Sequence, residues 1–346
     1  MSGPGEEAIR AAFRVQAEFC CASGSPLTAE ICSILADRLD HATRTGAAIL
    51  DWPGDPLVDA LMMRITGGLN ALARSGQDPQ LSGLYADRKG DFAGIVPRVI
   101  RDWDDWLFGW LDGPPQTNEV ARASGLFPGI MAVTHRFGPN VELIELGPSA
   151  GLNLNMDRFG YDLGGVKAGD PASPLQLKPE WAGPPPVSAQ VNVVSRVGID
   201  RSPLAVSDPG VAERLMAFVW PDQDARLARI EAAIAIARQF PPPIEQGDAA
   251  EWTEARLATP QSEGVARIVY HSIVLQYLPP EGRARVSAAI AKAGAAATEN
   301  RPLAWLSYEF HAQVPMAELR LTTWPDGEMV KLADCHPHGA VINWRG

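Results

Sequence analysis

The sequence has little cysteine. Its 346 residues contain four cysteines, too few and too unevenly spaced for a disulfide framework. Small buried hydrophobic side chains in a reducing compartment are the expected role of these residues, which are Cys20, Cys21, Cys32 and Cys335.

Long apolar runs are also missing. No stretch reaches 18 predominantly apolar residues, so the sequence predicts no membrane-spanning helix. The first residues, Met1 to Glu7, are polar and acidic, unlike the basic start of a secretory signal. We therefore expect a cytoplasmic protein.

Positive charge is in deficit along the whole chain. The net charge is −11, and 30 Lys and Arg face 41 Asp and Glu. Neither half is basic, which disfavours a nucleic acid or an anionic membrane as partner. The apolar fraction of 46 % is ordinary for a globular protein, and the length suggests about two domains.

Residues 1–136 read as an all-helical N-terminal domain. Residues 8–21 have a helical composition, and residues 28–39 space Ile31, Ile34 and Leu35 on one face behind a Thr28 cap. Three more helices are predicted, from Pro56 in a first turn to Leu72, over residues 95–111, and over residues 118–137 with an interruption near Gly125 and Pro128.

A strand, a turn and a helix follow, and they are the most informative stretch. The apolar residues 141–146 predict a buried strand, and small residues up to Gly151 predict a tight turn. Residues 152–159 are predicted as the first turns of a helix. Such a corner is typical of nucleotide binding, because the helix N–H groups face the turn.

The remaining chain, residues 137–346, predicts a second domain. Residues 160–186 contain 11 Gly or Pro in 27 positions, so a surface insertion, either a lid or a linker, is expected over residues 160–190. Strands and helices then alternate up to residue 310, and the tail contains strands alone. The fold class is therefore α/β, with a mostly parallel sheet that has an antiparallel end.

Polar residues follow the predicted parallel strands where each strand ends. Ligands of open parallel sheets gather at these ends. Asp200 follows the second strand, where a carboxylate can accept both hydroxyls of a ribose; Asp248 follows the third, where one can accept from an adenine amino group. His271 and Ser272 end the fourth strand.

These motifs resemble class I S-adenosylmethionine-dependent methyltransferases over roughly residues 140–310. The resemblance rests on Glu-x-Gly-x-Ser-x-Gly from Glu145, Gly-Ile-Asp-Arg-Ser-Pro around Asp200, Gly-Asp-Ala around Asp248, and the run from Ile268 to Pro279. Most of the chain also resembles a bacterial family of uncharacterised proteins. Members of that family share Ser-Ala-Gly-Leu-Asn-Leu (149–154), Trp-Pro-Asp-Gln (220–223) and His-Gly (338–339).

The resemblance implies a Rossmann-like domain that binds S-adenosylmethionine and methylates a small molecule. It places Asp200 at the ribose and His271 beside the transferred methyl group, with Asp248 and Ala249 at the adenine. The methionine side of the site would comprise Glu145, Gly147, Ser149, Gly151 and Asn153.

Two features depart from the pattern. Ser149 replaces the usual middle glycine, and Pro148 stiffens the turn. The acid Asp200 lies 49 positions after Gly151, whereas a dinucleotide fingerprint expects about 20.

Several alternatives stay open from the sequence. NAD is the competing cofactor, but the acid Glu145 would repel a pyrophosphate and would suit a sulfonium. Base catalysis is needed only for a protonated acceptor, and the candidates are His271, Tyr277, Glu309 and His338. The cluster Cys335-His336-Pro337-His338 makes a poor metal signature, so no metal is expected. The other reading is a non-catalytic binding or regulatory protein; the acceptor and the oligomeric state stay undetermined.

Overall fold

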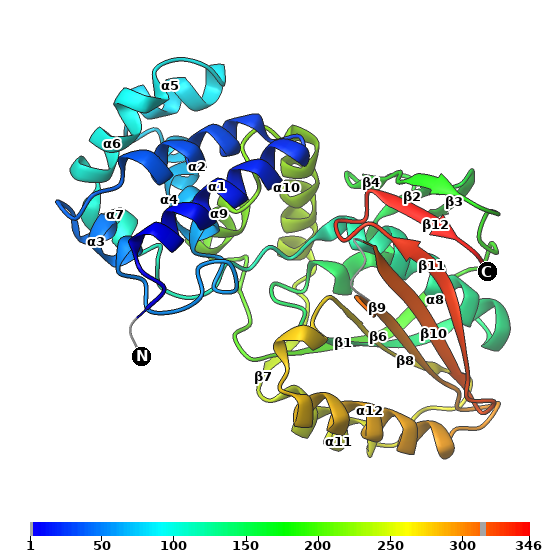
Figure 1. The fold of residues 1–346 in the computed structure, drawn as a ribbon. Helices are drawn as coiled ribbons and strands as arrows, with labels where there is room; N and C mark the ends of the chain where they lie inside the picture. The colour runs from blue at the N-terminus through cyan, green and yellow to red at the C-terminus, as the bar shows by residue number, and fades with distance from the viewer. Residues whose placement is uncertain (1–2, 312–315) are drawn as a thin grey trace. The chain divides into compact units, whose positions relative to one another are not determined.

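A computed structural model describes residues 3–311 and 316–346, and the chain divides into two compact units (Figure 1). The helical unit comprises Met1–Thr117 and Asp208–Ala228, and the sheet unit comprises Asn118–Ser207 and Arg229–Gly346. These units do not coincide with a single boundary at residue 136. Each unit is described by itself below.

The helical unit is built around one apolar core. Its buried residues include Phe13, Leu35, Leu69 and Val96, one from each of four different helices. The helices of this unit are α1 (Glu6–Ala22), α2 (Pro26–Arg38), α3 (Arg44–Leu50), α4 (Leu61–Ser75), α5 (Pro79–Asp87), α6 (Phe92–Asp102), α7 (Asp104–Phe108) and α9 (Pro209–Ala217), and α10 (Asp224–Gln239) begins in it.

Some predicted helix boundaries in this unit are wrong. Thr28 does not cap α2, because the helix already begins at Pro26 and the capping position is Ser25. Pro56 lies in turns before α4 rather than in its first turn. The helix predicted over residues 95–111 is two helices, α6 and α7, which meet at Trp103.

Residues 208–228 belong to the helical unit, and one of their side chains caps the N-terminus of α2. The Asp222 carboxylate accepts hydrogen bonds from the Leu27 backbone N–H (3.0 Å) and from the Ser25 hydroxyl. Trp220 packs in the same core, edge-on against Phe19. The Trp-Pro-Asp-Gln motif therefore has a structural role here.

Replacing Asp222 by alanine should lower the free energy of unfolding of the helical unit by about 1–2 kcal/mol, as for other lost helix caps. Urea unfolding followed by circular dichroism measures this. Asp224→Ala is the matched control, since the Asp224 side chain is 72 % exposed in its pair with Arg88 and should contribute little. Equal stability of the two variants would contradict the capping role.

The sheet unit contains a nine-stranded sheet in the order β5-β12-β11-β10-β9-β8-β1-β6-β7. Strands β7, β6, β1, β8 and β9 run parallel, β10, β11 and β12 continue antiparallel, and β5 pairs parallel with β12. In sheet order the strands are β5 (Glu180–Ala182), β12 (Val341–Trp344), β11 (Glu328–Cys335), β10 (Ala317–Trp324), β9 (Leu303–Glu309), β8 (Ala266–Ser272), β1 (Asn140–Leu146), β6 (Asn192–Asp200) and β7 (Ile244–Gln246). The prediction of a mostly parallel sheet with an antiparallel end is confirmed.

Helices cover both faces of this sheet. Leu303 and Trp305 of β9 pack in the core with α11 (Ala249–Leu257) and α12 (Pro280–Ala295), which lie side by side in Figure 1. The alternate residues Leu306 and Tyr308 contact α8 (Ala123–Phe137), which follows η1 (Val120–Arg122). Because successive strand residues point to opposite faces, α8 covers the face opposite α11 and α12.

Helix α8 is continuous, so the interruption predicted near Gly125 and Pro128 is wrong. Its glycines allow close packing: a Cβ at Gly125 would lie 2.9 Å from the Tyr308 ring, and one at Gly129 would lie 2.7 Å from Leu306. Tertiary packing therefore outweighs the weak helix propensity of these residues. Helix α11 was missed by the sequence analysis.

The Gly- and Pro-rich stretch is more ordered than the predicted surface insertion. Residues Tyr161, Leu163 and Leu177 are buried, and the stretch forms a small second sheet in the order β3-β2-β4. The strands are β2 (Gly160–Leu163), β3 (Val166–Gly169) and β4 (Gln176–Leu177), and β5 of the main sheet follows. Gly164 and Gly165 both have positive φ, so glycine supplies the turn between β2 and β3.

The predicted helix after the turn is a 3₁₀ segment, η2 (Leu152–Arg158). An ion pair with two hydrogen bonds fixes it to β6, because Arg196 donates to Asp157 at 2.7 Å and 2.9 Å. A third short segment, η3 (Leu275–Tyr277), follows β8.

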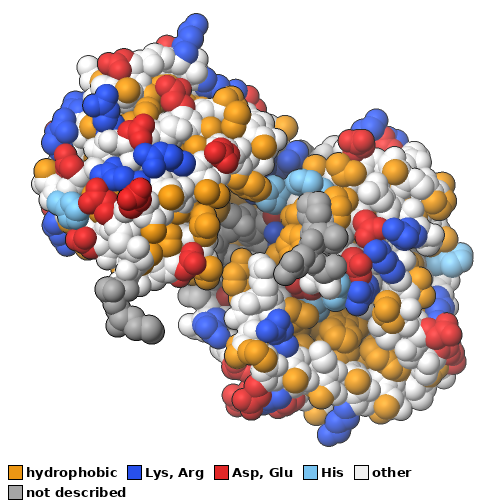
Figure 2. All heavy atoms as spheres, viewed as in Figure 1, with side chains coloured by type: hydrophobic (Ala, Val, Ile, Leu, Met, Phe, Trp, Pro, Cys, Tyr) orange, Lys and Arg blue, Asp and Glu red, His pale blue; other side chains and the backbone are white. Residues whose placement is uncertain are grey.

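The surface carries charges of both signs. Figure 2 shows acidic and basic side chains interspersed on the visible face of each unit. No helix among the described residues is long and apolar enough to cross a lipid bilayer.

Candidate functional site

The turn after β1 has a sharply bent backbone. Gly147, Ser149 and Gly151 all have positive φ, at 67°, 57° and 68°. For Ser149 this conformation is uncommon, because its Cβ crowds the backbone. Two hydrogen bonds hold the turn: Gly147 N–H donates to Ile199 O (2.9 Å), and Gly151 N–H donates to Pro148 O (2.8 Å).

Pro148 and Gly151, two residues of this turn, are packed against neighbouring side chains. Pro148 lies against β6, where a Cβ on Gly198 would come within 2.6 Å of its ring. Gly151 faces Pro242 and Ile244, with a Cβ there only 2.7 Å from Pro242. The absence of a side chain at Gly151 therefore makes room for these residues of the protein itself.

Asp200, at the end of β6, binds the turn directly. One carboxylate oxygen accepts a hydrogen bond from the Ser149 N–H (2.8 Å), and the other accepts one from the Ser202 N–H (2.8 Å). A carboxylate oxygen has two lone pairs, so each oxygen can still accept a bond from a ligand hydroxyl. Asp200 thus joins the ends of β1 and β6.

Asp248 lies beside Asp200 at the end of β7. Gly247 N–H donates to Asp200 O (3.0 Å). The Asp248 Oδ1 caps α11 by accepting from Ala250 N–H (2.9 Å) and Glu251 N–H (3.0 Å), and the bond from Glu251 is the main reason that its pKa is lowered. Ala249 is the first residue of α11. The structure therefore brings Ser149, Asp200 and Asp248 together at one edge of the sheet.

Glu145 is buried beneath this edge. It is 2 % exposed, and its Oε2 accepts a hydrogen bond from the Tyr270 hydroxyl (3.1 Å). Burial raises its pKa to about 8. This value includes a smaller rise from the nearby charge of Asp200, and the hydrogen bond from Tyr270 and the charge of Arg122 act in the opposite direction.

Asn153 contributes an unsatisfied polar atom. It is 1 % exposed, and its Nδ2 donates to Glu119 O (3.1 Å). Within the described part of the chain its Oδ1 has no hydrogen-bond partner. A buried acceptor without a donor is costly, so this atom suits a donor supplied by a ligand or a water molecule.

His271 and Glu309 form a closed pair. His271 is fully buried; its Nδ1 lies 2.7 Å from Glu309 Oε1, and its Nε2 accepts from the Trp305 indole N–H (2.9 Å). Because an indole nitrogen can only donate, His271 carries its proton on Nδ1 and donates it to Glu309. Both imidazole nitrogens are thus engaged.

Glu309 also fixes the loop after β8. Its Oε1 accepts from Val274 N–H (2.9 Å) and Leu275 N–H (3.3 Å). Burial raises the pKa of Glu309, but the hydrogen bonds from His271, Val274 N–H and Leu275 N–H together hold it below its ordinary value. Ile273 in this loop has a φ of 54°, a strained conformation for a β-branched residue.

The predicted site residues divide between the two faces of the sheet. Ile144 and Val269 lie in the core with α11 and α12, so their neighbours Glu145 and Tyr270 face the opposite side. His271 shares the face of Val269. The structure therefore brings Glu145, Asn153 and Tyr270 together, and separately His271 with Glu309.

The last two predicted residues lie outside both clusters. Tyr277, in η3, is 74 % exposed. His338 lies in the turn before β12, where its N–H donates to His336 Nδ1 (3.2 Å). The nearby Cys335 is buried, and its pKa is raised to about 12 by that burial. Within residues 3–311 and 316–346, no three His, Cys, Asp or Glu side chains are grouped to hold a metal ion.

Arg122 is a site residue that the sequence analysis missed. Its Nε donates to Pro337 O and its Nη1 donates to Ser272 O, both at 2.9 Å. The charge of Arg122 acts on Glu145 and on Tyr308, so it lies near the ends of β1 and β9. No sequence signal marks it, because its partners are 150 and 215 positions away.

Comparison with known proteins gives a family but no activity. No curated protein and no solved structure matches the chain. A family model matches residues 10–344, and its description is an uncharacterised protein conserved in bacteria, DUF2332. These matches add no support for a methyltransferase. Since the match spans nearly the whole chain, this protein belongs to the DUF2332 family of bacterial proteins.

Proposed function

We propose that the sheet unit binds S-adenosylmethionine at the carboxyl ends of β1, β6 and β7 and transfers its methyl group to a small molecule. The observation that carries the proposal is the Asp200 carboxylate, bonded to the turn after β1 and adjacent to Asp248. In this arrangement the two ribose hydroxyls of the cofactor donate hydrogen bonds to the Asp200 carboxylate, and its adenine lies toward Asp248.

The strand order supports this location. The parallel strands follow the order third, second, first, fourth and fifth (β7-β6-β1-β8-β9), so the order reverses between β1 and β8. In open α/β sheets, ligands bind outside the carboxyl ends of the strands at such a switch point. The turn at Gly147 and the segment around Ser272 flank this point.

The charge of the site supports a cationic cofactor. Asp200 is close enough to Glu145 for its negative charge to raise the pKa of the Glu145 carboxyl. The Asp200 carboxylate would repel the pyrophosphate of NAD and attract a sulfonium or an ammonium, and such a cation would favour the ionised form of Glu145. The unpartnered Asn153 Oδ1 is a further acceptor for an N–H donor.

Methyl transfer to a nucleophilic acceptor needs no general acid or base from the protein. The cofactor supplies an electrophilic methyl group, and the protein has to align it with the acceptor. His271 and Glu309 bond to each other, to Trp305 and to the backbone, so we assign them the role of shaping the loop after β8. Acceptors that are nucleophilic without base assistance are therefore favoured.

Calorimetric titration with S-adenosylmethionine and S-adenosylhomocysteine tests the proposal. Asp200→Ala should weaken binding by about 1.5–3 kcal/mol, because it removes charge-assisted bonds to the ribose. Asp162→Ala is the control, since it removes the same charge from the small sheet of the same unit, where Asp162 pairs with Lys167. Its affinity should match that of the wild type.

Unchanged affinity in Asp200→Ala would remove Asp200 from the site, and no heat with either compound would end the enzymatic proposal. A non-catalytic ligand-binding or regulatory protein is the second candidate. The closed His271–Glu309 pair favours it over a methyltransferase that needs a general base, because neither side chain is left to exchange a proton with an acceptor.

A further inference from the structure

We propose that Arg122 binds the carboxylate group of a ligand at the carboxyl end of β8. This inference deepens the proposed function and rests on it for the position of the ligand. It adds that the ligand carries a carboxylate group.

The guanidinium of Arg122 has donors to spare. An arginine side chain has five N–H donors, and the two bonds of Arg122 go to neutral backbone carbonyls, Pro337 O and Ser272 O. Among the residues that the structure describes, no carboxylate lies within ion-pair distance of it. Burial lowers its pKa, and Glu119 and Glu309 raise it only through longer-range charge. A partly desolvated cation thus lacks a direct anionic partner.

The arginine is held in place before any ligand arrives. Gly339 packs on the backbone beneath it, since a Cβ there would lie 2.1 Å from Ala121 O and 2.7 Å from Arg122 N. This contact seats the C-terminal loop that supplies Pro337 O. The Tyr308 hydroxyl fastens the same loop by donating to His336 O (2.6 Å). Such preorganisation reduces the ordering cost of binding.

A carboxylate fits the surroundings better than a phosphate does. A planar carboxylate matches the arginine fork and brings one negative charge. A phosphate group would bring up to two negative charges into a region that already holds the carboxylates of Glu119 and Glu309. The carboxylate can come from the amino-acid end of the cofactor or from the acceptor.

Binding to wild type and Arg122→Met distinguishes these sources. S-adenosylhomocysteine carries a carboxylate, and 5′-methylthioadenosine lacks the amino-acid end. If the cofactor supplies the carboxylate, Arg122→Met should lose about 10- to 100-fold in affinity for the first compound and none for the second. If the acceptor supplies it, both affinities stay unchanged, and benzoate binds to the cofactor-saturated wild type but not to the variant.

Arg122→Lys keeps the positive charge but lacks the forked guanidinium, so its affinity for the carboxylate ligand should lie between those of the wild type and Arg122→Met. Arg136→Met, which removes an exposed arginine paired with Asp326, is the matched control. Equal binding of S-adenosylhomocysteine and of benzoate to wild type and to a folded Arg122→Met would overturn the inference. If no adenosyl compound binds the wild type, the proposed function fails, while benzoate binding to the free protein still decides the role of Arg122.

Discussion

Replacing Glu142 by alanine is expected to lower the free energy of unfolding by about 3–5 kcal/mol, because it leaves a buried arginine without its counter-ion. Glu142 lies in β1, at the end of the strand opposite the candidate site. Its Oε2 accepts from Arg267 Nε (2.7 Å), and its Oε1 accepts from Arg256 Nη2 (2.5 Å). Arg267 is 4 % exposed.

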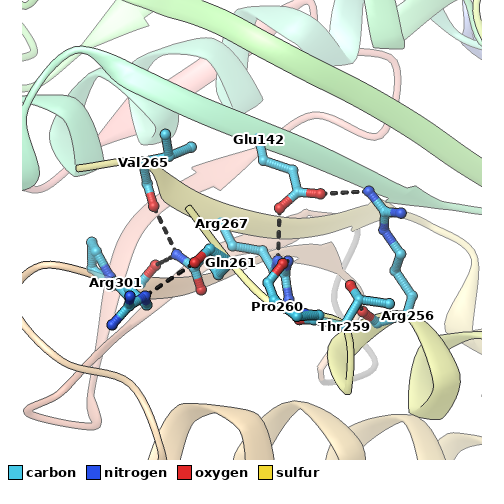
Figure 3. A network of polar contacts seen from close by, with 9 residues as sticks. Glu142, Arg256, Thr259, Pro260, Gln261, Val265, Arg267 and Arg301 are labelled. Atoms are coloured by element: carbon cyan, nitrogen blue, oxygen red, sulfur yellow. Dashed lines mark hydrogen bonds and ion pairs between the residues drawn. The ribbon is translucent and has the colours of Figure 1, made fainter. Parts of the chain in front are cut away.

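Figure 3 shows Glu142 and Arg267 together with the residues of the connection between α11 and β8 that surround them. Arg267 donates to the carbonyls of Thr259 (3.1 Å) and Pro260 (3.2 Å), in the connection between α11 and β8. Gln261 continues the network by donating to Val265 O (2.7 Å). Loss of Glu142 therefore leaves the charge of Arg267 unbalanced where it contacts only backbone carbonyls.

Urea unfolding of Glu142→Ala measures the loss. Glu254→Ala is the matched control, because its pair with Arg285 is 44 % exposed on both sides and should contribute little to stability. The double variant Glu142→Leu with Arg267→Met should be more stable than Glu142→Ala, since it removes both charges. A loss in Glu142→Ala no larger than that of the control would show that the pair is not effectively buried.

The regular part of the sheet was predictable because its strands carry their own signal. Residues 141–146 and 266–272 are apolar runs that end in small or polar residues, as strands buried on both faces do. Asp200 and Asp248 were predicted as site residues because each follows a predicted strand, although the strand before Asp248 has only three residues and is mostly exposed. Their convergence needed only the rule that carboxyl ends of parallel strands share one edge.

The remaining features depend on contacts that are distant in sequence. Segment 208–228 has the composition of an ordinary helix, and its contacts with distant residues assign it to the helical unit: Asp222 with the start of α2, Trp220 in the helical core, and Ala217 and Val219 with Asn70. The Gly- and Pro-rich stretch looked irregular because its strands have two to four residues, too few for a periodic pattern. Arg122 is placed at the site by its hydrogen bonds to the carbonyls of Ser272 and Pro337, which the sequence does not reveal.

The free energy of unfolding of the wild type is expected to fall between about pH 5 and pH 8, and Glu145→Gln is expected to remove most of that fall. In the folded protein, burial raises the pKa of Glu145 from 4.5 to about 8. Over this range the folded protein therefore keeps a proton that the unfolded chain has released. Stability must fall as the pH rises through this window, by up to about 5 kcal/mol for a shift of this size.

The direction in which stability changes with pH distinguishes Glu145 from the other groups whose pKa is shifted. Asp78 has its pKa lowered to about 2, first by its hydrogen bond with Arg98, so its contribution disappears only below about pH 4. His311 has its pKa lowered by burial, so its contribution makes the folded protein more stable as the pH rises toward 6.5 and stays constant above that. Among these groups, Glu145 alone predicts a decrease between pH 5 and 8.

Urea unfolding at several pH values compares the wild type with Glu145→Gln. Glutamine keeps the shape and can still accept from Tyr270, but it cannot ionise, so its stability should be nearly constant over the window. Binding supplies a second readout, because a sulfonium near Glu145 favours the ionised carboxylate. Affinity for S-adenosylmethionine should rise with pH up to about 8 in the wild type and not in Glu145→Gln. Parallel pH profiles of stability for the two proteins would mean that Glu145 is already ionised in the folded state.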